Sequence, residues 1–179
     1  MSTPSPEVAT FMLQNISLPA LKGENATTLK VIRAIPLDKG DYRPEPIAKS
    51  GIELAWHMAV AEHRFLEAVA AGAFNFDPLP RPDSVRNSAD IADWYATSFE
   101  GDLQRLAALS GEQLVKIVDF RGMFQLPAIA YVQFNLHHII HHRGQLSTYL
   151  RPMGGKVPNI YGESYDGTEA RKAAQAKSA

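Results

Sequence analysis

The sequence predicts an all-α fold, a four-helix bundle, from three observations. Four long segments carry apolar residues at three- and four-residue steps, the spacing that places them on one face of a helix. Each segment starts at residues typical of a helix start and ends at a glycine or proline. The 179 residues, 45% hydrophobic and 21% charged, are enough for one sizeable core and short for two. We therefore expect a single helical domain over residues 1–170, followed by a flexible tail over 171–179.

The first two helices have well-marked ends. The first should begin at Ser5, which precedes a proline at the first helical position and an acidic residue in the first turn. It should end before Pro36, and Pro19, which lacks a backbone N–H, should kink or split it. The second should begin at Ser50, in a capping box with the glutamate three residues later, and end at Gly72.

The other two helices and a hairpin account for the rest of the domain. The third helix should start near Asn87 and fade at a serine–glycine pair. The fourth should start at Pro127 and end in the proline- and glycine-containing segment 151–155. Residues 115–120 look β-like, and a short β-hairpin with 123–125 is therefore expected between the third and fourth helices.

Composition excludes several classes of function. With 18 Lys+Arg against 19 Asp+Glu, the formal charge of −1 gives no overall attraction to nucleic acid or an anionic membrane, and we expect neither as a partner. The chain has no cysteine, so a metal must be held by histidine, carboxylate or water. The first ten residues do not resemble a secretory signal, and no apolar stretch is long enough to span a membrane. A cytoplasmic location is expected.

Histidines concentrate on the predicted fourth helix, which carries four of the six. Two histidines four residues apart project from the same helix face and can bind one cation. His138 and His142 form one such pair, and His137 and His141 form a second pair rotated by about 100°. The first pair shares its face with large apolar residues, so it should point inward. We therefore favour His138 and His142 as metal ligands and expect His137 and His141 to be solvent-exposed.

The third ligand is expected to be His57, and this choice decides the topology. At 1.5 Å per residue, His57 lies about 10 Å from the start of its helix and His142 about 13 Å from the end of the fourth. The two levels match if these helices are antiparallel, whereas parallel helices leave a mismatch of about 7 to 12 Å. Metal–nitrogen bonds of about 2.1 Å do not tolerate that. The sequence thus predicts an up-down-down-up bundle, with residues 73–86, which can extend to about 45 Å, crossing its length.

Other polar residues have two interpretations each. Asn135 is either a neighbour of the metal site or substrate, or a surface amide. Arg143 can pair with an anionic substrate, although a structural salt bridge is favoured. Tyr161 and Glu163 either cover a pocket mouth or belong to an ordinary surface segment, which is favoured. His63, flanked by charged residues, is expected on the surface.

Two motifs give the chain a resemblance to the DinB/YfiT-like superfamily of four-helix metal-binding proteins. The first is Glu-Leu-Ala-Trp-His at 53–57, and the second is His-Ile-Ile-His-His-Arg-Gly-Gln-Leu at 138–146. The segment 149–158 also follows the second motif as it often does in that family. The order and helix placement match over residues 6–166.

This resemblance implies an up-down-down-up bundle, often a homodimer, with a three-histidine metal site at His57, His138 and His142. It implies a divalent transition metal, with zinc, nickel, iron and manganese all found in the family. It also implies, for some members, transferase or isomerase activity with a low-molecular-weight thiol. Because this chain has no cysteine, such a thiol would be supplied by the substrate or a cofactor.

Three functions follow from these expectations. Three histidine ligands leave coordination positions open for water or substrate, which suits a catalytic site. We therefore expect a metal-dependent enzyme acting on a small-molecule substrate, as a thiol-dependent transferase or a hydrolase. The alternative is a non-enzymatic, stress-associated, homodimeric metal-binding protein, and the third is a structural bundle with buried histidines. A pocket that opens onto the site would favour the enzyme, and a sealed site would favour the alternative.

Overall fold

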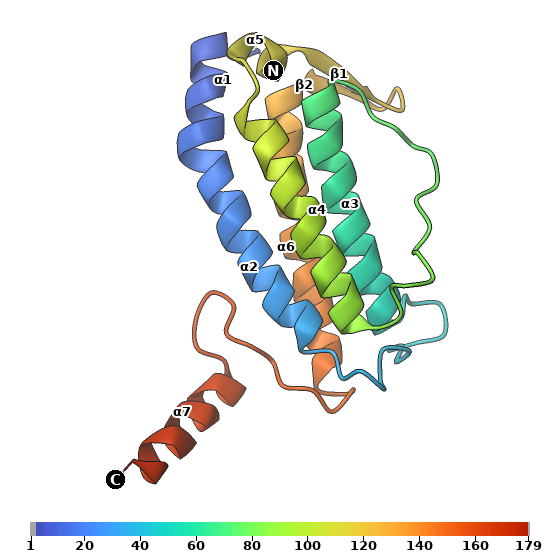
Figure 1. The fold of residues 1–179 in the computed structure, drawn as a ribbon, viewed down its shortest axis with the longest axis vertical. Coiled ribbons are helices and arrows are strands. Elements are labelled where there is room, and N and C mark those ends of the chain that lie inside the picture. The colour runs from blue at the N-terminus through green and yellow to red at the C-terminus, as the bar shows by residue number, and fades with distance from the viewer. Residues whose placement is uncertain (1–2, 179) are drawn as a thin grey trace.

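The structure is a computed structural model that describes residues 3–178, and it confirms the all-α class (Figure 1). The first two residues of the predicted domain and the last residue of the predicted tail lie outside the described residues. One long helical segment and three further long helices form the bundle, with a small hairpin at one end. In chain order the elements are α1 (Pro6–Met12), the π-helical turn η1 (Leu13–Ser17), α2 (Leu18–Arg33), α3 (Gly51–Ala71), α4 (Ser88–Ala107), α5 (Gly111–Val115), β1 (Ile117–Phe120), β2 (Phe124–Pro127), α6 (Ala128–Leu150) and α7 (Tyr165–Lys177).

The bundle has the predicted up-down-down-up topology. In Figure 1, α1 and α2 run down the molecule, α3 and α4 both run up, and α6 runs down again. The chain between α3 and α4 therefore crosses the full length of the bundle, as predicted for residues 73–86. As a result α3 is antiparallel to α6, which it contacts along its length, and parallel to its other neighbour, α4.

Local signals set the helix ends where the sequence predicts them. Ser50 forms its capping box at the start of α3, and Asn87 forms a second one with an aspartate at the start of α4. Gly72 ends α3 in the left-handed conformation, with φ of 71°, which glycine adopts without steric cost. The first helix is interrupted at the expected place, because the π-helical turn η1 ends just before Pro19. The Leu18 N–H there donates to the Leu13 carbonyl, five residues back.

The hairpin is present but begins two residues later than predicted. Val115 belongs to the short helix α5, which Ser110 starts with a capping box of its own. β1 and β2 then pair antiparallel, with Val118 opposite Leu126. The correction has a local cause, since the cap at Ser110 favours one helical turn over the β propensity of the residues that follow.

The core consists of two apolar clusters, one toward each end of the bundle, with polar groups between them. Glu62, an ionisable residue on α3, is buried, with only 1% of its surface exposed. Its carboxyl group accepts hydrogen bonds from the Tyr95 hydroxyl and, at 2.8 Å, from the Asn135 amide. Burial raises the pKa of Glu62 to about 7, against an ordinary value of 4.5. This carboxyl group therefore retains its proton well above the pH at which an exposed glutamate loses it.

Glu62→Gln is expected to stabilise the protein at pH 8 and to have little effect near pH 4.5. In the wild type, folding favours protonated Glu62. The contribution of this group to stability is therefore full below pH 4.5, falls as pH rises to about 7 and is absent above that. Glutamine keeps the shape without the charge, and we expect a gain of about 2 kcal/mol at pH 8 from urea denaturation. Glu67→Gln, on the exposed face of the same helix, is the matched control. A Glu62→Gln protein less stable than wild type at pH 8 would contradict the expected effect of burial.

The C-terminal residues form a helix that extends away from the bundle (Figure 1). α7 has no buried side chain, and an ion pair of 2.8 Å between Arg171 and Glu163 joins it to the preceding segment. The predicted tail is thus helical as far as Lys177, while its flexibility stays a prediction. Among the described residues, no helix combines the length and the apolar character needed to cross a membrane.

Candidate metal centre

Three histidines from two antiparallel helices meet at one place. His57 projects from α3, and His138 and His142 project from α6. One ring nitrogen of each lies within 4.8 Å of the others, and the Nε2 atoms of His57 and His142 are 3.3 Å apart. Two nitrogen ligands of one tetrahedral zinc ion are about 3.4 Å apart, given bonds of about 2.1 Å. The three side chains that the sequence singles out are therefore arranged as ligands of a single ion would be.

The hydrogen bonds of the ring nitrogens leave lone pairs for an ion. His142 Nδ1 lies 3.0 Å from Gln145 Oε1, and because the amide oxygen can only accept, Nδ1 carries the proton and Nε2 has a free lone pair. Gln145 in turn donates to the Tyr149 hydroxyl at 3.3 Å, which fixes its orientation. His138 Nδ1 is buried and has no hydrogen-bond partner among the described residues. A buried ring nitrogen without a partner is unusual in an ordinary core, where buried polar atoms are nearly always hydrogen-bonded.

All three rings are neutral at pH 7. Burial lowers the pKa of His57 to about 4, with smaller contributions from the neighbouring His142 and Lys49. Burial also lowers the pKa of His138 to about 4, with contributions from the other histidines. The pKa of His142 is lowered by burial, although its bond to Gln145 opposes the shift. Only a neutral imidazole binds a metal, so all three rings are in the protonation state that a metal ligand requires.

The remaining histidines lie outside this group. His137 and His141 are solvent-exposed, as predicted, and His137 contacts Gln133 at 3.2 Å. The expectation that His63 lies on the surface is wrong, because its ring is only 21% exposed. Its Nδ1 lies 2.9 Å from the carboxylate of Asp102, which is buried. Asp102 comes from α4, so no pattern within α3 could indicate this pair.

The other candidate residues serve the fold. Asn135 is completely buried and donates to Glu62, so it is not a surface amide. Arg143 forms the favoured structural salt bridge, 2.5 Å from Glu24. Tyr161 donates to Glu24 at 2.9 Å and accepts from Arg143 at 2.6 Å, so it joins this ion pair rather than covering a pocket.

Gln145 is the residue that sequence reasoning missed. It lies three residues after His142, which is the spacing at which two side chains on a helix touch. A search for polar residues one turn from each predicted ligand would have identified it as the group that orients His142. Its sequence neighbour Gly144 is exposed and makes no close packing contact.

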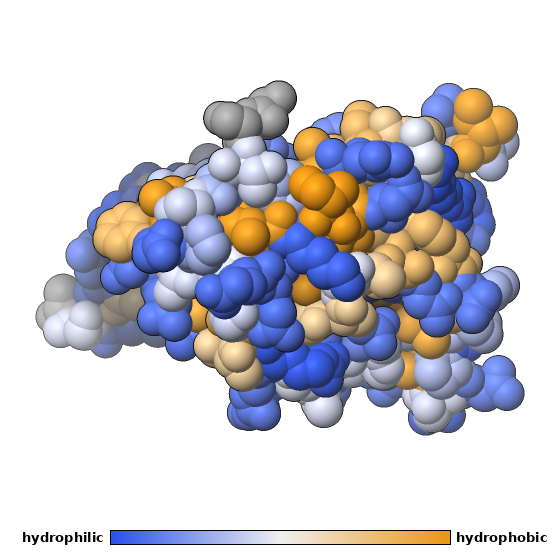
Figure 2. Space-filling model, turned by 90° about the horizontal axis from the view of Figure 1, so that it is seen from above, coloured by the Kyte–Doolittle hydropathy of each residue, from blue (hydrophilic) through white to orange (hydrophobic). Residues whose placement is uncertain are grey.

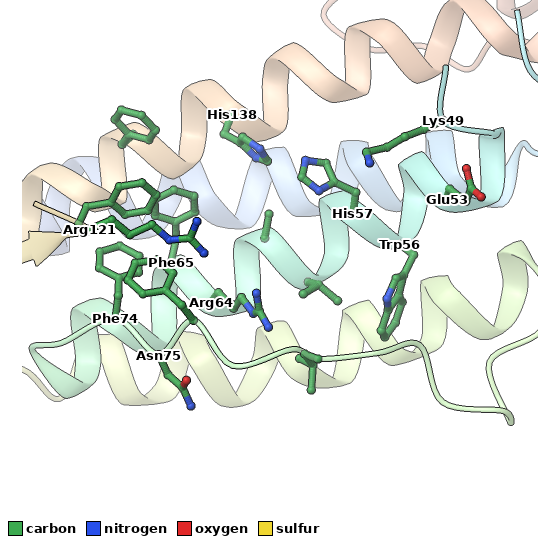
Figure 3. A pocket seen from close by; sticks show the side chains of 16 residues that line it. Lys49, Glu53, Trp56, His57, Arg64, Phe65, Phe74, Asn75, Arg121 and His138 are labelled. Atoms are coloured by element: carbon green, nitrogen blue, oxygen red, sulfur yellow. The ribbon is translucent and has the colours of Figure 1, made fainter. Parts of the chain in front are cut away.

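A cavity of about 560 Å³ opens beside the histidines (Figure 3). His57 and His138 line it, so two of the three rings are accessible from it. Its walls come from α3, α6, the crossover segment and the hairpin turn, which converge at this point. The volume is within the range of small-molecule binding sites, about 300 to 1,000 Å³. The site is therefore open to a ligand rather than sealed.

Comparisons with known proteins agree with this fold. A family model described as the DinB family matches residues 12–174. The uncharacterized protein YjoA of Bacillus subtilis (strain 168) is 28% identical over 129 residues, which cover 71% of this chain and 82% of YjoA. The crystal structure of the DinB-like protein YjoA from Bacillus subtilis has a TM-score of 0.68 and 24% identity, and the match covers 83% of this chain and 99% of that chain. A DinB-like protein from Bacillus cereus ATCC 10987 has a TM-score of 0.68 and 22% identity, with 81% and 95% covered.

Proposed function

The chain belongs to the DinB family, and we propose that it is a metal-dependent enzyme acting on a small molecule, as a thiol-dependent transferase or a hydrolase. The observation that carries this proposal is the cavity that opens onto His57 and His138. A protein that only stores a metal or uses it for stability has no need of such access. A structural bundle, in turn, has no need of three neutral imidazoles that face one another.

The chain's own residues have separate tasks in this proposal. His57, His138 and His142 would hold a divalent transition ion. Gln145 accepts a hydrogen bond from Nδ1 of His142, which leaves the Nε2 lone pair of that ring available to the ion. When bound, such an ion supplies Lewis acidity toward a substrate oxygen or a thiol. The phenylalanines that line the cavity give it an apolar wall beside the histidines. Because the chain contains no cysteine, a thiol would arrive with the substrate or a cofactor.

Turnover that depends on metal tests this proposal. Protein purified without an affinity tag would be stripped with a chelator and reloaded in turn with zinc, nickel, iron(II) or manganese. Each form would be assayed with a low-molecular-weight thiol plus an electrophile, and with ester substrates. We expect at least one loaded form to turn over substrate, with at least a hundredfold loss in His138→Ala and none in His137→Ala. Tight metal binding without turnover in any form would favour the non-enzymatic alternative.

The homodimer stays a prediction, and one surface fits it. Val8, Phe11, Met12 and Ile16, separated by three, one and four residues along α1 and η1, are all exposed. Exposed apolar stripes of this kind commonly mark contacts between proteins. Analytical ultracentrifugation of the full chain, and of a Phe11→Glu variant, decides whether a dimer forms through this stripe.

A further inference from the structure

We propose that the cavity beside the three histidines binds an anionic small molecule with an apolar, ring-sized body, and that Arg64 and Arg121 recognise its acidic group. The inference rests on the proposed function, because this molecule would be the substrate. It adds the chemical class of that substrate, and it assigns two specificity-determining residues outside the metal site.

The charge of the lining is the first support. Three cationic side chains, Lys49, Arg64 and Arg121, line the cavity, against one carboxylate, Glu53. Glu53 is already paired, since its Oε1 lies 2.7 Å from Arg43. The whole chain carries a formal charge of −1, so this surplus of positive charge is local to the cavity. Low-dielectric walls concentrate the field of such groups and favour an anion.

The two arginines are held in place without being neutralised. Arg64 donates to the backbone carbonyl of Asp77, which ties it to the crossover segment. The guanidinium of Arg121 lies over the ring of Phe76, 4.3 Å from its centroid. Neither arginine forms an ion pair within 4.0 Å among the described residues. A guanidinium held by a carbonyl or a ring keeps further N–H groups for a carboxylate or phosphate.

The backbone at Arg121 is a second, independent support. Arg121 has a φ of 55°, in the left-handed region that glycine and asparagine adopt far more readily than arginine. Among the described residues it is the only one other than glycine with a positive φ. The turn therefore carries a residue that is unfavourable there for stability. A strained residue at a cavity wall suggests that its side chain is needed for binding.

The rest of the wall matches an apolar body. Five phenylalanines line the cavity toward the hairpin, where their rings contact one another: Phe65, Phe74, Phe76, Phe120 and Phe134. Apolar side chains also interrupt the charged surface at this end of the molecule (Figure 2). Edge and face contacts with these rings would favour an aromatic or fused-ring ligand.

The arrangement orients such a ligand toward the histidines. In Figure 3, Arg121 lies beside Phe65 and Phe74, Arg64 lies below His138, and Lys49 lies on the other side of His57. A ligand whose acidic group is held by the arginines would therefore occupy the same cavity that His57 and His138 line. The arginines thus position the ligand, while the histidines are left free for the metal.

Isothermal titration calorimetry with two matched probes tests the proposal. The probes are 2-naphthoate and its neutral isostere 2-naphthamide, titrated into the full chain in both zinc-loaded and chelator-stripped form. We expect the wild type to bind naphthoate at least tenfold more tightly than naphthamide in both forms, because the arginines do not depend on the metal. In the double variant Arg64→Gln, Arg121→Asn, that preference should fall below threefold.

Two further variants distinguish recognition from general effects. Arg33→Gln removes an exposed arginine that does not line the cavity, and it should leave the tenfold preference unchanged. Arg121→Asn alone should weaken naphthoate binding while the melting temperature stays equal or rises, because asparagine tolerates the left-handed backbone. A loss of binding together with a lower melting temperature would indicate damage to the turn and would overturn the role of Arg121.

The failure of this inference can be told apart from the failure of the proposed function. Equal binding of the two probes, binding of neither, or a preference that survives the double variant would overturn the anion site. A preference seen only in zinc-loaded protein would also overturn it, since the carboxylate would then bind the metal. A zinc titration of the same samples reports on the histidine site separately, so either result can be obtained without the other.

Discussion

His57→Ala is expected to weaken metal binding at least a hundredfold and to abolish stabilisation by metal. The variant removes one of three ligands. The remaining pair on α6 would bind an ion only as weakly as two histidines on a protein surface do. For the wild type at a metal concentration of one hundred times Kd, linkage predicts about 2.7 kcal/mol of added stability. In a chain of this length that corresponds to a rise of roughly 5 to 10 °C in melting temperature.

Calorimetry and thermal melts with added zinc, nickel or manganese measure this effect. His137→Ala is the matched control, because it removes an exposed histidine from the same helix and should leave binding unchanged. Equal stabilisation of the wild type and His57→Ala by metal would show that the three histidines do not form the site. Binding kept in His57→Ala but lost in His137→Ala would point instead to the exposed pair, His137 and His141.

The same site predicts how pH acts on the metal-free protein. The pKa of His57 and His138 is about 4 in the folded chain, against 6.5 ordinarily. As pH falls from 6.5 to 4 the unfolded chain takes up these protons first, so stability falls over that window and is unaffected above it. We expect a loss of about 2 kcal/mol for the pair, because partial exposure of both rings reduces the full effect. Replacing both histidines with alanine should flatten this part of the profile.

Arg143→Ala is expected to lower the free energy of unfolding by about 3 to 5 kcal/mol, the largest loss predicted for a single side chain here. Arg143 is 1% exposed and pairs with Glu24, while its guanidinium also donates to the Glu24 carbonyl and to Tyr161. Removing it leaves a cavity and a largely buried carboxylate without its cationic partner. The hydrogen bond from Arg143 to the Tyr161 hydroxyl would be lost as well, which leaves Tyr161 bonded to Glu24 alone.

Urea denaturation at pH 7 measures this loss. The control is Arg151→Ala, which breaks a 3.1 Å pair between an exposed arginine and Asp166 and should cost less than about 1 kcal/mol. Glu24→Gln tests the charge alone and should fall between the two. An Arg143→Ala protein within 1 kcal/mol of wild type would mean that water replaces the ion pair without penalty.

Most of the fold could be predicted from local sequence features, and so could the histidine group. The caps at Ser50 and Asn87 and the stop at Gly72 act within one helical turn, so a short segment is enough to recognise them. The depth of His57 along its helix requires α3 and α6 to be antiparallel, and the structure has that arrangement. The resemblance to the DinB family, drawn from two short motifs, is confirmed by the match over residues 12–174.

What only the tertiary structure decided involves partners far apart in the chain. The sequence alone would place Glu62 on the surface, but in the structure Tyr95 and Asn135 from other helices donate hydrogen bonds to it. The sequence would likewise place His63 on the surface, but its ring contacts Asp102 of α4. The cavity is likewise made by α3, α6, the crossover segment and the hairpin together. Helix caps and helix faces depend on neighbours within about four residues, so the sequence alone determines them. Burial, the pKa of a buried acid and the shape of a pocket depend on which surfaces pack together, and only the assembled bundle defines these.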